Sequence, residues 1–373
     1  MPLITSRSRN ALGAACALLP LFFLSAWWVP SQTTRATVLA PPNARLAEDL
    51  VEVHTGRELA DGRLLIGEGT LGSRRLLVVD FQRGTAQQIG SRGHGPGEYQ
   101  IVSSLFPLAS DSTLLLAEMG RWLVLSGTRI VRTVNGNDPA MRLAMTPSGA
   151  DSIGNLLSSE RRALAPDSSG RIFVSRKTGI ATPAARLRSS TEAGYPPPAT
   201  RRAGGRVDFS NGPWESYELA QLFPDGWLAV ARVQPYRVDW RTPEGRWILG
   251  KPLPSPTVRV TRREKAAYMQ RSAERTGNAV RSPTVHSKWP TEIPPFLPGS
   301  LIGSSDGRLL VLRTPTADRP EVRYDLIDRQ GRLERQLLLD RNQRIVAFGK
   351  TSVYVVVTDD VDLERIQRHS WPE

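Results

Sequence analysis

Four acidic residues are the side chains in this sequence best suited to holding a metal ion: Glu98, Glu118, Asp239 and Asp325. Carboxylate oxygens are the ligands that calcium and other divalent cations prefer. A metal-dependent hydrolase or lyase would need about three or four ligands that converge on one point. No pair of these acids has the short spacing of a local motif, so a metal centre would require distant parts of the chain to meet.

The four histidines offer no zinc motif. His54, His94, His286 and His369 are far apart and lack the paired spacing of zinc ligands. The only cysteine, Cys16, lies near the N-terminus, so the chain forms no internal disulfide. Any fold must therefore be held by its hydrophobic core.

The densest loop motif is GHGPGEY at residues 93–99. In a binding site, His94 and Glu98 would face the ligand. In a structural role, the glycines adopt positive φ, Glu98 accepts backbone N–H groups and Tyr99 packs inward. The structural interpretation is favoured. No strand–loop–helix pattern surrounds the motif, so it is not a phosphate-binding loop.

Aromatic and basic side chains supply the remaining candidates for a binding face. Several tryptophans have the surface needed to stack on sugars, although packing within the fold is the favoured role: Trp122, Trp214, Trp227, Trp240 and Trp247. A proline-rich stretch carries further candidates, His286, Lys288 and Trp289. The candidate ligand-binding residues are therefore His94, Glu98, Arg121, Trp122, His286 and Trp289.

A recurring unit predicts the architecture that must position these residues. Six times, a polar turn is followed at once by an apolar run of β type, as in DGRLLIGEG at 61–69 and DGRLLVLR at 306–313. Such repetition is typical of β-propellers. The sequence predicts an all-β, six-bladed β-propeller of four-stranded antiparallel blades. The last unit is one strand short, and residues 47–54 are expected to supply that strand and close the ring.

Residues 1–40 are expected to lie outside this fold, and residues 41–373 to form it. Arg7 and Arg9 precede an uncharged apolar run at 11–29, a pattern typical of a signal peptide or a signal anchor. We expect export to the periplasm, the cell envelope or the extracellular space. Lipidation at Cys16 is disfavoured, because Gly13 replaces the usual large aliphatic residue and the apolar run continues past the cysteine.

Two irregular regions interrupt the repeats. An insertion at about 252–300 lies between the fourth and fifth units. Within it, Thr261 begins a capping-box pattern before a helix expected over 264–276, and a proline-rich arm is expected over 283–298. The stretch 178–213 is rich in proline, glycine and arginine and is expected to be a long loop.

The charge balance is basic, with a formal net charge of +13 carried mainly by arginine. Such a balance can indicate an anionic partner. Here the arginines are scattered, which favours a general composition bias, although one region is notably basic: Arg161, Arg162, Arg186, Arg188, Arg201, Arg202 and Arg206. Because export separates the protein from nucleic acids, no nucleic-acid partner is expected.

The segment 89–125 resembles the NHL-type repeat of six-bladed propellers. Gly93, Gly95 and Gly97 match its glycine-spaced loop, and Glu118 and Arg121 match its acidic and basic positions in type. The usual proline is displaced and the usual aspartate is Glu118. The GPGEY form also resembles a group of exported bacterial propellers. The resemblance implies the fold and says almost nothing about activity.

Together these features predict an exported, monomeric, non-catalytic scaffold that binds a peptide, glycan or protein, with no cofactor. Membrane contact is expected only through an uncleaved N-terminal segment. The alternative is a metal-dependent, lactonase-like hydrolase or lyase, with calcium or another divalent metal held by acids in the axial channel.

Overall fold

The computed structural model describes residues 36–70, 72–118, 120–135, 148–159, 168–175, 180–188, 213–214, 216–276, 289–304 and 306–371. The chain divides into Met1–Thr33 and a compact unit, Thr34–Glu373, which holds all of these residues. Apart from the helix α2 (Arg262–Thr276), their regular structure is β. Within the described ranges, no helix is long and apolar enough to cross a membrane.

Antiparallel sheets follow one another along the chain. The first holds β3 (Val53–Glu58), β4 (Leu64–Glu68), β5 (Arg75–Asp80) and β6 (Thr85–Gln88), and the second holds β9 (Leu105–Pro107), β10 (Ser112–Glu118), β11 (Arg121–Ser126) and β12 (Arg129–Asn135). Between them lies a short parallel pair, β7 (Ser91–Arg92) and β8 (Glu98–Tyr99). The third sheet holds β13 (Gly149–Ala150), β14 (Asn155–Ser159), β15 (Ser168–Ser175) and β16 (Ala181–Arg188).

The remaining sheets repeat the same order. The fourth holds β17 (Leu219–Leu222), β18 (Leu228–Arg232), β19 (Arg237–Arg241) and β20 (Trp247–Ile248). The fifth holds β21 (Leu301–Gly303), β22 (Leu309–Leu312), β23 (Val322–Ile327) and β24 (Leu333–Leu339), extended by β1 (Ala36–Val38). The last holds β25 (Gln343–Phe348), β26 (Ser352–Thr358) and β27 (Glu364–Ser370), with β2 (Ala44–Arg45).

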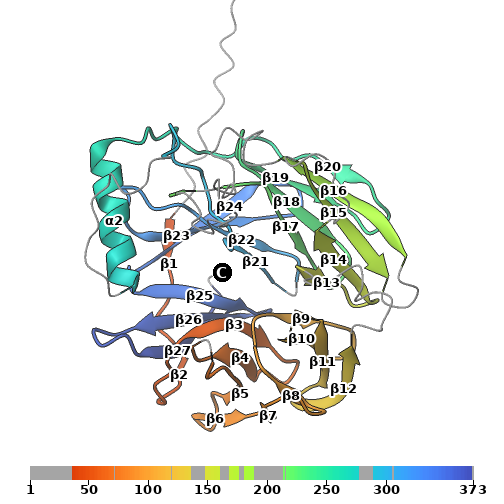
Figure 1. Cartoon of the computed structure of the whole chain (residues 1–373). Coiled ribbons are helices and arrows are strands. Elements are labelled where there is room, and N and C mark those ends of the chain that lie inside the picture. Colours follow the sequence, from red (N-terminus) through yellow and green to blue (C-terminus); the bar gives the residue numbers. More distant parts are fainter. Residues whose placement is uncertain are drawn as a thin grey trace, which may run out of the picture. The chain divides into compact units, whose positions relative to one another are not determined.

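The first strand of each sheet lies at the centre of the arrangement. Figure 1 shows β3, β9, β13, β17, β21 and β25 grouped around the middle, and each contacts the next in cyclic order. Glycines permit this close approach, because a Cβ at Gly56 would lie 3.0 Å from Ala347 and one at Gly303 would lie 3.0 Å from Phe223. The chain is therefore an all-β propeller, as the repeats predicted. The β13–β16 sheet is described only in part.

The predicted turns are confirmed where Asp-Gly follows an inner strand. Gly62, Gly226 and Gly307 have φ values of +83°, +84° and +88°. These values lie in the left-handed region, which glycine enters without the Cβ clash that other residues suffer. Each turn delivers the chain directly into the apolar second strand.

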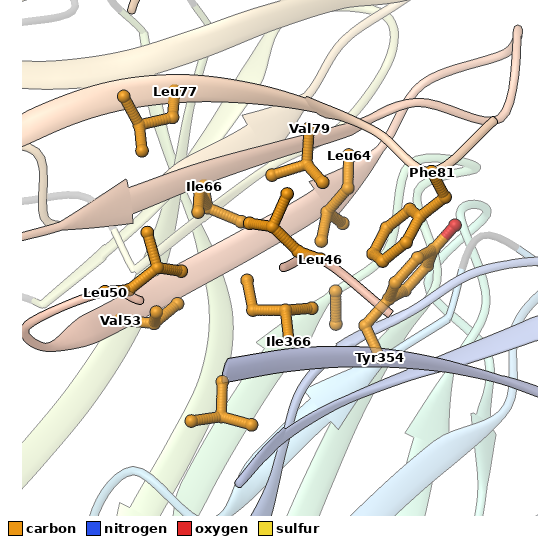
Figure 2. Packing of buried hydrophobic residues seen from close by; sticks show 12 residues of the cluster. Leu46, Leu50, Val53, Leu64, Ile66, Leu77, Val79, Phe81, Tyr354 and Ile366 are labelled. Atoms are coloured by element: carbon orange, nitrogen blue, oxygen red, sulfur yellow. The ribbon is translucent and has the colours of Figure 1, made fainter. Parts of the chain in front are cut away.

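The N-terminal segment completes the last sheet, but at a different place from the one predicted. Ala44 and Arg45 form β2, which pairs with β27, whereas part of 47–54 begins β3 of the first sheet. Leu46 and Leu50 then pack into an apolar cluster between the last and first sheets, together with Ile66 (Figure 2). The correction has a simple cause: two paired residues and one bridge, Leu50 to Glu364, are enough to hold the edge.

Two boundaries also differ from expectation. Residues 36–38 were expected outside the fold, but as β1 they pair in parallel with Gln336, Leu337 and Leu338 of β24. Residues 181–188 were expected in a loop, yet they form β16, in which Ala184 and Leu187 are buried. Proline at 183 hides the pattern, and next to it a bulge at Ala184 of β16, opposite Arg171/Ile172 of β15, shifts the pairing register.

The helix in the insertion agrees with the prediction. The hydroxyl of Thr261 accepts a hydrogen bond from the backbone N–H of Glu264 at 3.3 Å, as an N-cap does. The Glu264 carboxylate is buried and accepts the backbone N–H of Ala317 at 2.8 Å, which ties α2 to the segment before β23.

Candidate functional site

A central channel of about 1240 Å³ is the first candidate site in the described part of the chain. Its wall is built by the inner strands and the loops that follow them, so every sheet contributes to it. Residues of all sheets line it, including Arg57, Ser104, Ser148, Gln221, Ser300 and Arg344.

Several charged groups of this channel already have hydrogen-bonding partners. The Arg57 guanidinium lies 3.1 Å from the Asp111 carboxylate and also donates to the Thr113 hydroxyl. Burial lowers the pKa of Arg57, and the charge of Asp111 partly opposes that effect. Glu58 accepts the Tyr354 hydroxyl at 2.7 Å and the backbone N–H of Lys350 at 3.1 Å.

Beyond these pairs, the channel wall is rich in hydroxyl and amide groups. Thr55, Ser103, Ser104 and Ser148 line it, and their side chains form no hydrogen bond within the described ranges. Such groups donate to and accept from neutral polar ligands. The channel is therefore suited chemically to hydrogen bonding more than to binding a net charge.

Arg121 holds the loop at 93–99 by hydrogen bonds to its backbone. Its guanidinium donates to the carbonyl oxygens of Gly93 at 2.9 Å and His94 at 2.7 Å. Glu98 accepts the backbone N–H of Gly95 at 2.7 Å, and the loop folds over this carboxylate. His94 is exposed, with Nδ1 3.3 Å from Glu118. Thus Arg121 and Glu98 hold the loop, and His94 is the member that faces solvent.

The candidate tryptophans lie in different environments. Trp122 and Trp240 are fully buried and present no surface to a ligand. Trp289 packs against Trp214 and Tyr268, with ring centroids 5.4 and 5.6 Å away, and so joins the arm to α2. His286, Lys288 and Cys16 lie outside the described residues.

The four candidate metal ligands do not meet. Glu98 begins the short strand β8, Glu118 ends β10, and Asp239 and Asp325 lie on the third strands β19 and β23, away from the channel lining. Within the ranges described above, no group of three or more histidine, cysteine, aspartate or glutamate side chains is placed to hold a metal.

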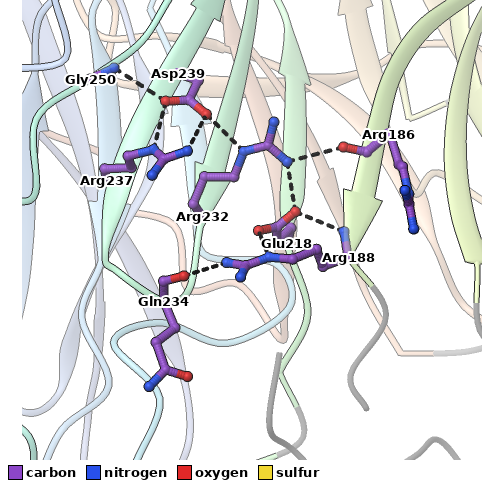
Figure 3. Close-up of polar contacts among 8 residues, drawn as sticks. All are labelled: Arg186, Arg188, Glu218, Arg232, Gln234, Arg237, Asp239 and Gly250. Atoms are coloured by element: carbon purple, nitrogen blue, oxygen red, sulfur yellow. Dashed lines mark hydrogen bonds and ion pairs between the residues drawn. The ribbon is translucent and has the colours of Figure 1, made fainter. Parts of the chain in front are cut away.

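Arginines hold the two buried aspartates instead. Asp325 accepts hydrogen bonds from Arg313 at 2.7 Å and Tyr236 at 2.9 Å. Asp239 accepts from Arg232 at 2.8 Å and Arg237 at 2.9 Å (Figure 3).

The same network includes a carboxylate that sequence reasoning missed, Glu218. It is fully buried and accepts from Arg188 at 2.7 Å and Arg232 at 2.6 Å. Burial alone would lower the pKa of Arg232, but its bonds to Asp239 and Glu218 outweigh burial and raise it. The only sequence signal was a lone acid before a β run, which does not reveal its distant partners.

One catalytic motif is also present by pattern alone. Residues 303–307 read GSSDG, which matches the Gly-x-Ser-x-Gly of hydrolase nucleophile elbows. That elbow joins a strand to a helix, whereas here the segment joins β21 to β22. The surrounding structure is therefore a hairpin and not a nucleophile elbow.

Comparisons with known proteins do not identify a family for this chain. No protein-family model matches the chain, and no curated protein matches its sequence. A Bacteroides fragilis protein named as a candidate exported protein is 12% identical, with a TM-score of 0.46 over 91% of this chain and 95% of that one. Regucalcin from Agrobacterium tumefaciens, a calcium-binding protein, is 10% identical, with a TM-score of 0.40 over 90% and 97%.

A streptogramin B lyase is 12% identical, with a TM-score of 0.37 over 88% of this chain and 86% of that chain. Similarity at this level says nothing about the ligand or activity of the present protein.

Proposed function

We propose that this protein is an exported, six-bladed propeller of the NHL type that acts as a non-catalytic binding scaffold. Its ligand is a glycan or a peptide segment bound at the central channel. The blade count rests on the cyclic contacts of the inner strands, and export rests on the apolar N-terminal run. We also propose that it is a monomer with no nucleic-acid partner.

The observation that carries this proposal is the character of the channel wall. Charged side chains such as Arg57 and Glu58 already have partners, while the hydroxyl groups of Ser103 and Ser104 are left to bind a ligand. Small-molecule pockets usually measure about 300–1000 Å³. At about 1240 Å³, the channel favours an oligosaccharide or a peptide over a single small metabolite.

Binding to glycan and peptide arrays tests this proposal. Ser148 is exposed and lines the channel, so Ser148→Trp would place an indole across the mouth without burying it. We expect this variant to lose binding. The matched control is Thr85→Trp, on the exposed outer strand β6, which should bind as the wild type does. Equal binding by both variants would exclude the channel as the binding surface.

A thermal-shift series tests the metal-dependent alternative in the same preparation. A metal that binds only the folded state raises the melting temperature by mass action. The alternative predicts that a chelator lowers the melting temperature and that calcium, magnesium, manganese or zinc then restores it. That result would favour the metal-dependent hydrolase or lyase over the binding scaffold. A flat series supports the scaffold.

A further inference from the structure

A second cavity, of about 440 Å³, lies where the β13–β16 sheet meets the β17–β20 sheet. Among the described residues, only Pro224 lines both this cavity and the central channel. The turn after β13, the strands β15 and β16, the turn after β17 and the end of β19 form its wall. The volume falls in the range of about 300–1000 Å³ that is typical of small-molecule sites.

A buried carboxylate forms one wall of this cavity. Asp151 is only 2% exposed, and it accepts hydrogen bonds from the backbone N–H and the side-chain amide of Asn155 at 2.7 and 2.9 Å. Burial raises the pKa of Asp151. Within the described part of the chain, no arginine or lysine pairs with it.

The corresponding turns of other sheets differ in this respect. In four of them the aspartate has an arginine partner: Asp61 with Arg63, Asp111 with Arg57, Asp225 with Arg329, and Asp306 with Arg308. Among these five turn aspartates, Asp151 alone has no arginine partner in the described part of the chain, and it lines the second cavity together with the paired Asp225.

An arginine without a carboxylate partner also lines the cavity. The guanidinium of Arg241 lies 5.2 Å from the centre of the Phe173 ring, and no acid of the described ranges lies within ion-pair distance of it. A guanidinium carries five N–H donors and binds carboxylates in a two-point geometry. Arg241 is thus held by stacking, with its donors available to a ligand.

The rim of the cavity is apolar. Ile153 is 84% exposed and Ile180 is 63% exposed, and both line the cavity. Exposed apolar side chains next to a cavity provide contact area for an aliphatic group.

We propose that this cavity binds a small zwitterion of the α-amino acid type with an aliphatic side chain. Arg241 pairs with the ligand carboxylate, Asp151 accepts hydrogen bonds from the ligand ammonium group, and the two isoleucines contact the ligand side chain. Because Arg241 and Asp151 line one cavity without pairing with each other, a ligand that carries both charges satisfies both. A simple anion would face the uncompensated Asp151, and a simple cation would face Arg241.

Calorimetric titration of the purified full-length protein with leucine tests this proposal. Two analogues each lack one charge: N-acetyl-leucine has no ammonium group, and leucine amide has no carboxylate. We expect leucine to bind and each analogue to bind at least about tenfold more weakly, because each loses a charged hydrogen bond. If N-acetyl-leucine binds as tightly as leucine, the proposal of a zwitterionic ligand is wrong. The ligand would then be the C-terminus of a peptide.

Three variants complete the test. Arg241→Gln and Asp151→Asn should each weaken leucine binding by at least about tenfold. Asparagine keeps one acceptor oxygen, which can accept the backbone N–H of Asn155, but it loses the second acceptor that faces the Asn155 amide, so a melting curve is needed to confirm that this variant folds. The matched control, Arg246→Gln, changes an exposed arginine on the same sheet that does not line the cavity, and it should bind as the wild type does. The proposal fails if the wild type binds neither leucine, isoleucine nor valine, or if Arg241→Gln binds leucine normally.

Discussion

Two junctions between neighbouring sheets are built in opposite ways. Where the last sheet meets the first, the contact is apolar and closely packed, with Leu46, Leu50 and Ile366 at its centre (Figure 2). Where the β13–β16 sheet meets the β17–β20 sheet, arginines hold Glu218 and Asp239 (Figure 3), and other residues of the same two sheets line a cavity of about 440 Å³. The first junction closes the ring, and the second offers uncompensated polar groups.

This difference suggests that, within one repeated architecture, different junctions serve stability and binding. Apolar packing is non-directional and tolerates any close arrangement of side chains. An ionic junction needs each donor aimed at its acceptor, because charge-assisted hydrogen bonds depend on geometry. We therefore expect the closing junction to dominate stability and the ionic junction to hold the more specific chemistry.

The largest effect should come from the apolar junction. Leu50 is fully buried, so Leu50→Ala removes buried apolar volume and is expected to lower the free energy of unfolding by about 2–5 kcal/mol. Its neighbour Val51 is 51% exposed, and Val51→Ala should change stability by no more than about 0.5 kcal/mol. Urea unfolding measures both. Similar losses for the two variants would mean that this junction does not hold the ring closed.

A smaller loss is expected from the ionic junction. Glu218→Gln keeps the shape of the side chain but removes the charge that faces Arg188 and Arg232, at a cost of about 2–3 kcal/mol. The arginine side chains are partly exposed, so the difference from the wild type should shrink in high salt. The control is Glu48→Gln, on an exposed glutamate, which should be neutral. If the loss of unfolding free energy does not change with salt concentration, the loss comes from packing and not from the charge of Glu218.

A polar contact within the apolar junction sharpens the comparison. The Tyr354 hydroxyl donates to Glu58 at 2.7 Å. Burial, and then the Glu58 charge, raise the pKa of Tyr354, so the hydroxyl stays protonated and remains a donor. Tyr354→Phe should cost about 1.5 kcal/mol by chemical denaturation. Tyr217→Phe serves as the control, because no hydrogen bond of the Tyr217 hydroxyl is found in the described part of the chain.

The smallest expected effect is a change in the pH dependence of stability. Burial raises the pKa of Asp151 above its unfolded value of about 3.9, so the native state binds a proton more tightly than the unfolded state does. Wild-type stability should therefore fall as pH rises through the folded pKa, and Asp151→Asn should remove that fall.

Asp61 is the matched residue with the opposite sign. A hydrogen bond from Arg63 is the main cause that lowers its pKa, so its contribution is present at neutral pH and is lost as pH falls through the folded pKa. Unfolding curves from acid to neutral pH should therefore separate Asp151→Asn from Asp61→Asn. Parallel curves would contradict the assigned environments.

Much of the fold was predictable because its signals are local. The Asp-Gly turns at 61–62, 225–226 and 306–307 require a glycine with positive φ, and each is followed by an apolar run that becomes a second strand. The helix at 262–276 was visible from its cap at Thr261 and its helix-forming residues.

The candidate site was far less predictable. Asp239 and Asp325 were chosen as acids, but their arginine partners were not apparent. Glu218 meets Arg188 across 30 residues of sequence. Asp151 gave no signal at all, because its distinction is the lack of a partner that the other turn aspartates have.

The sequence by itself determined the repeated turn-and-strand unit and the all-β class, since alternation and turn chemistry act between near neighbours. Only the tertiary structure decided that residues 44–45 close the last sheet and that residues 36–38 extend the fifth. It also decided which charges pair, and it left Asp151 and Arg241 on one cavity wall. Those outcomes depend on which distant backbone edges and side chains meet when the sheets close into a ring, and no local pattern encodes that meeting.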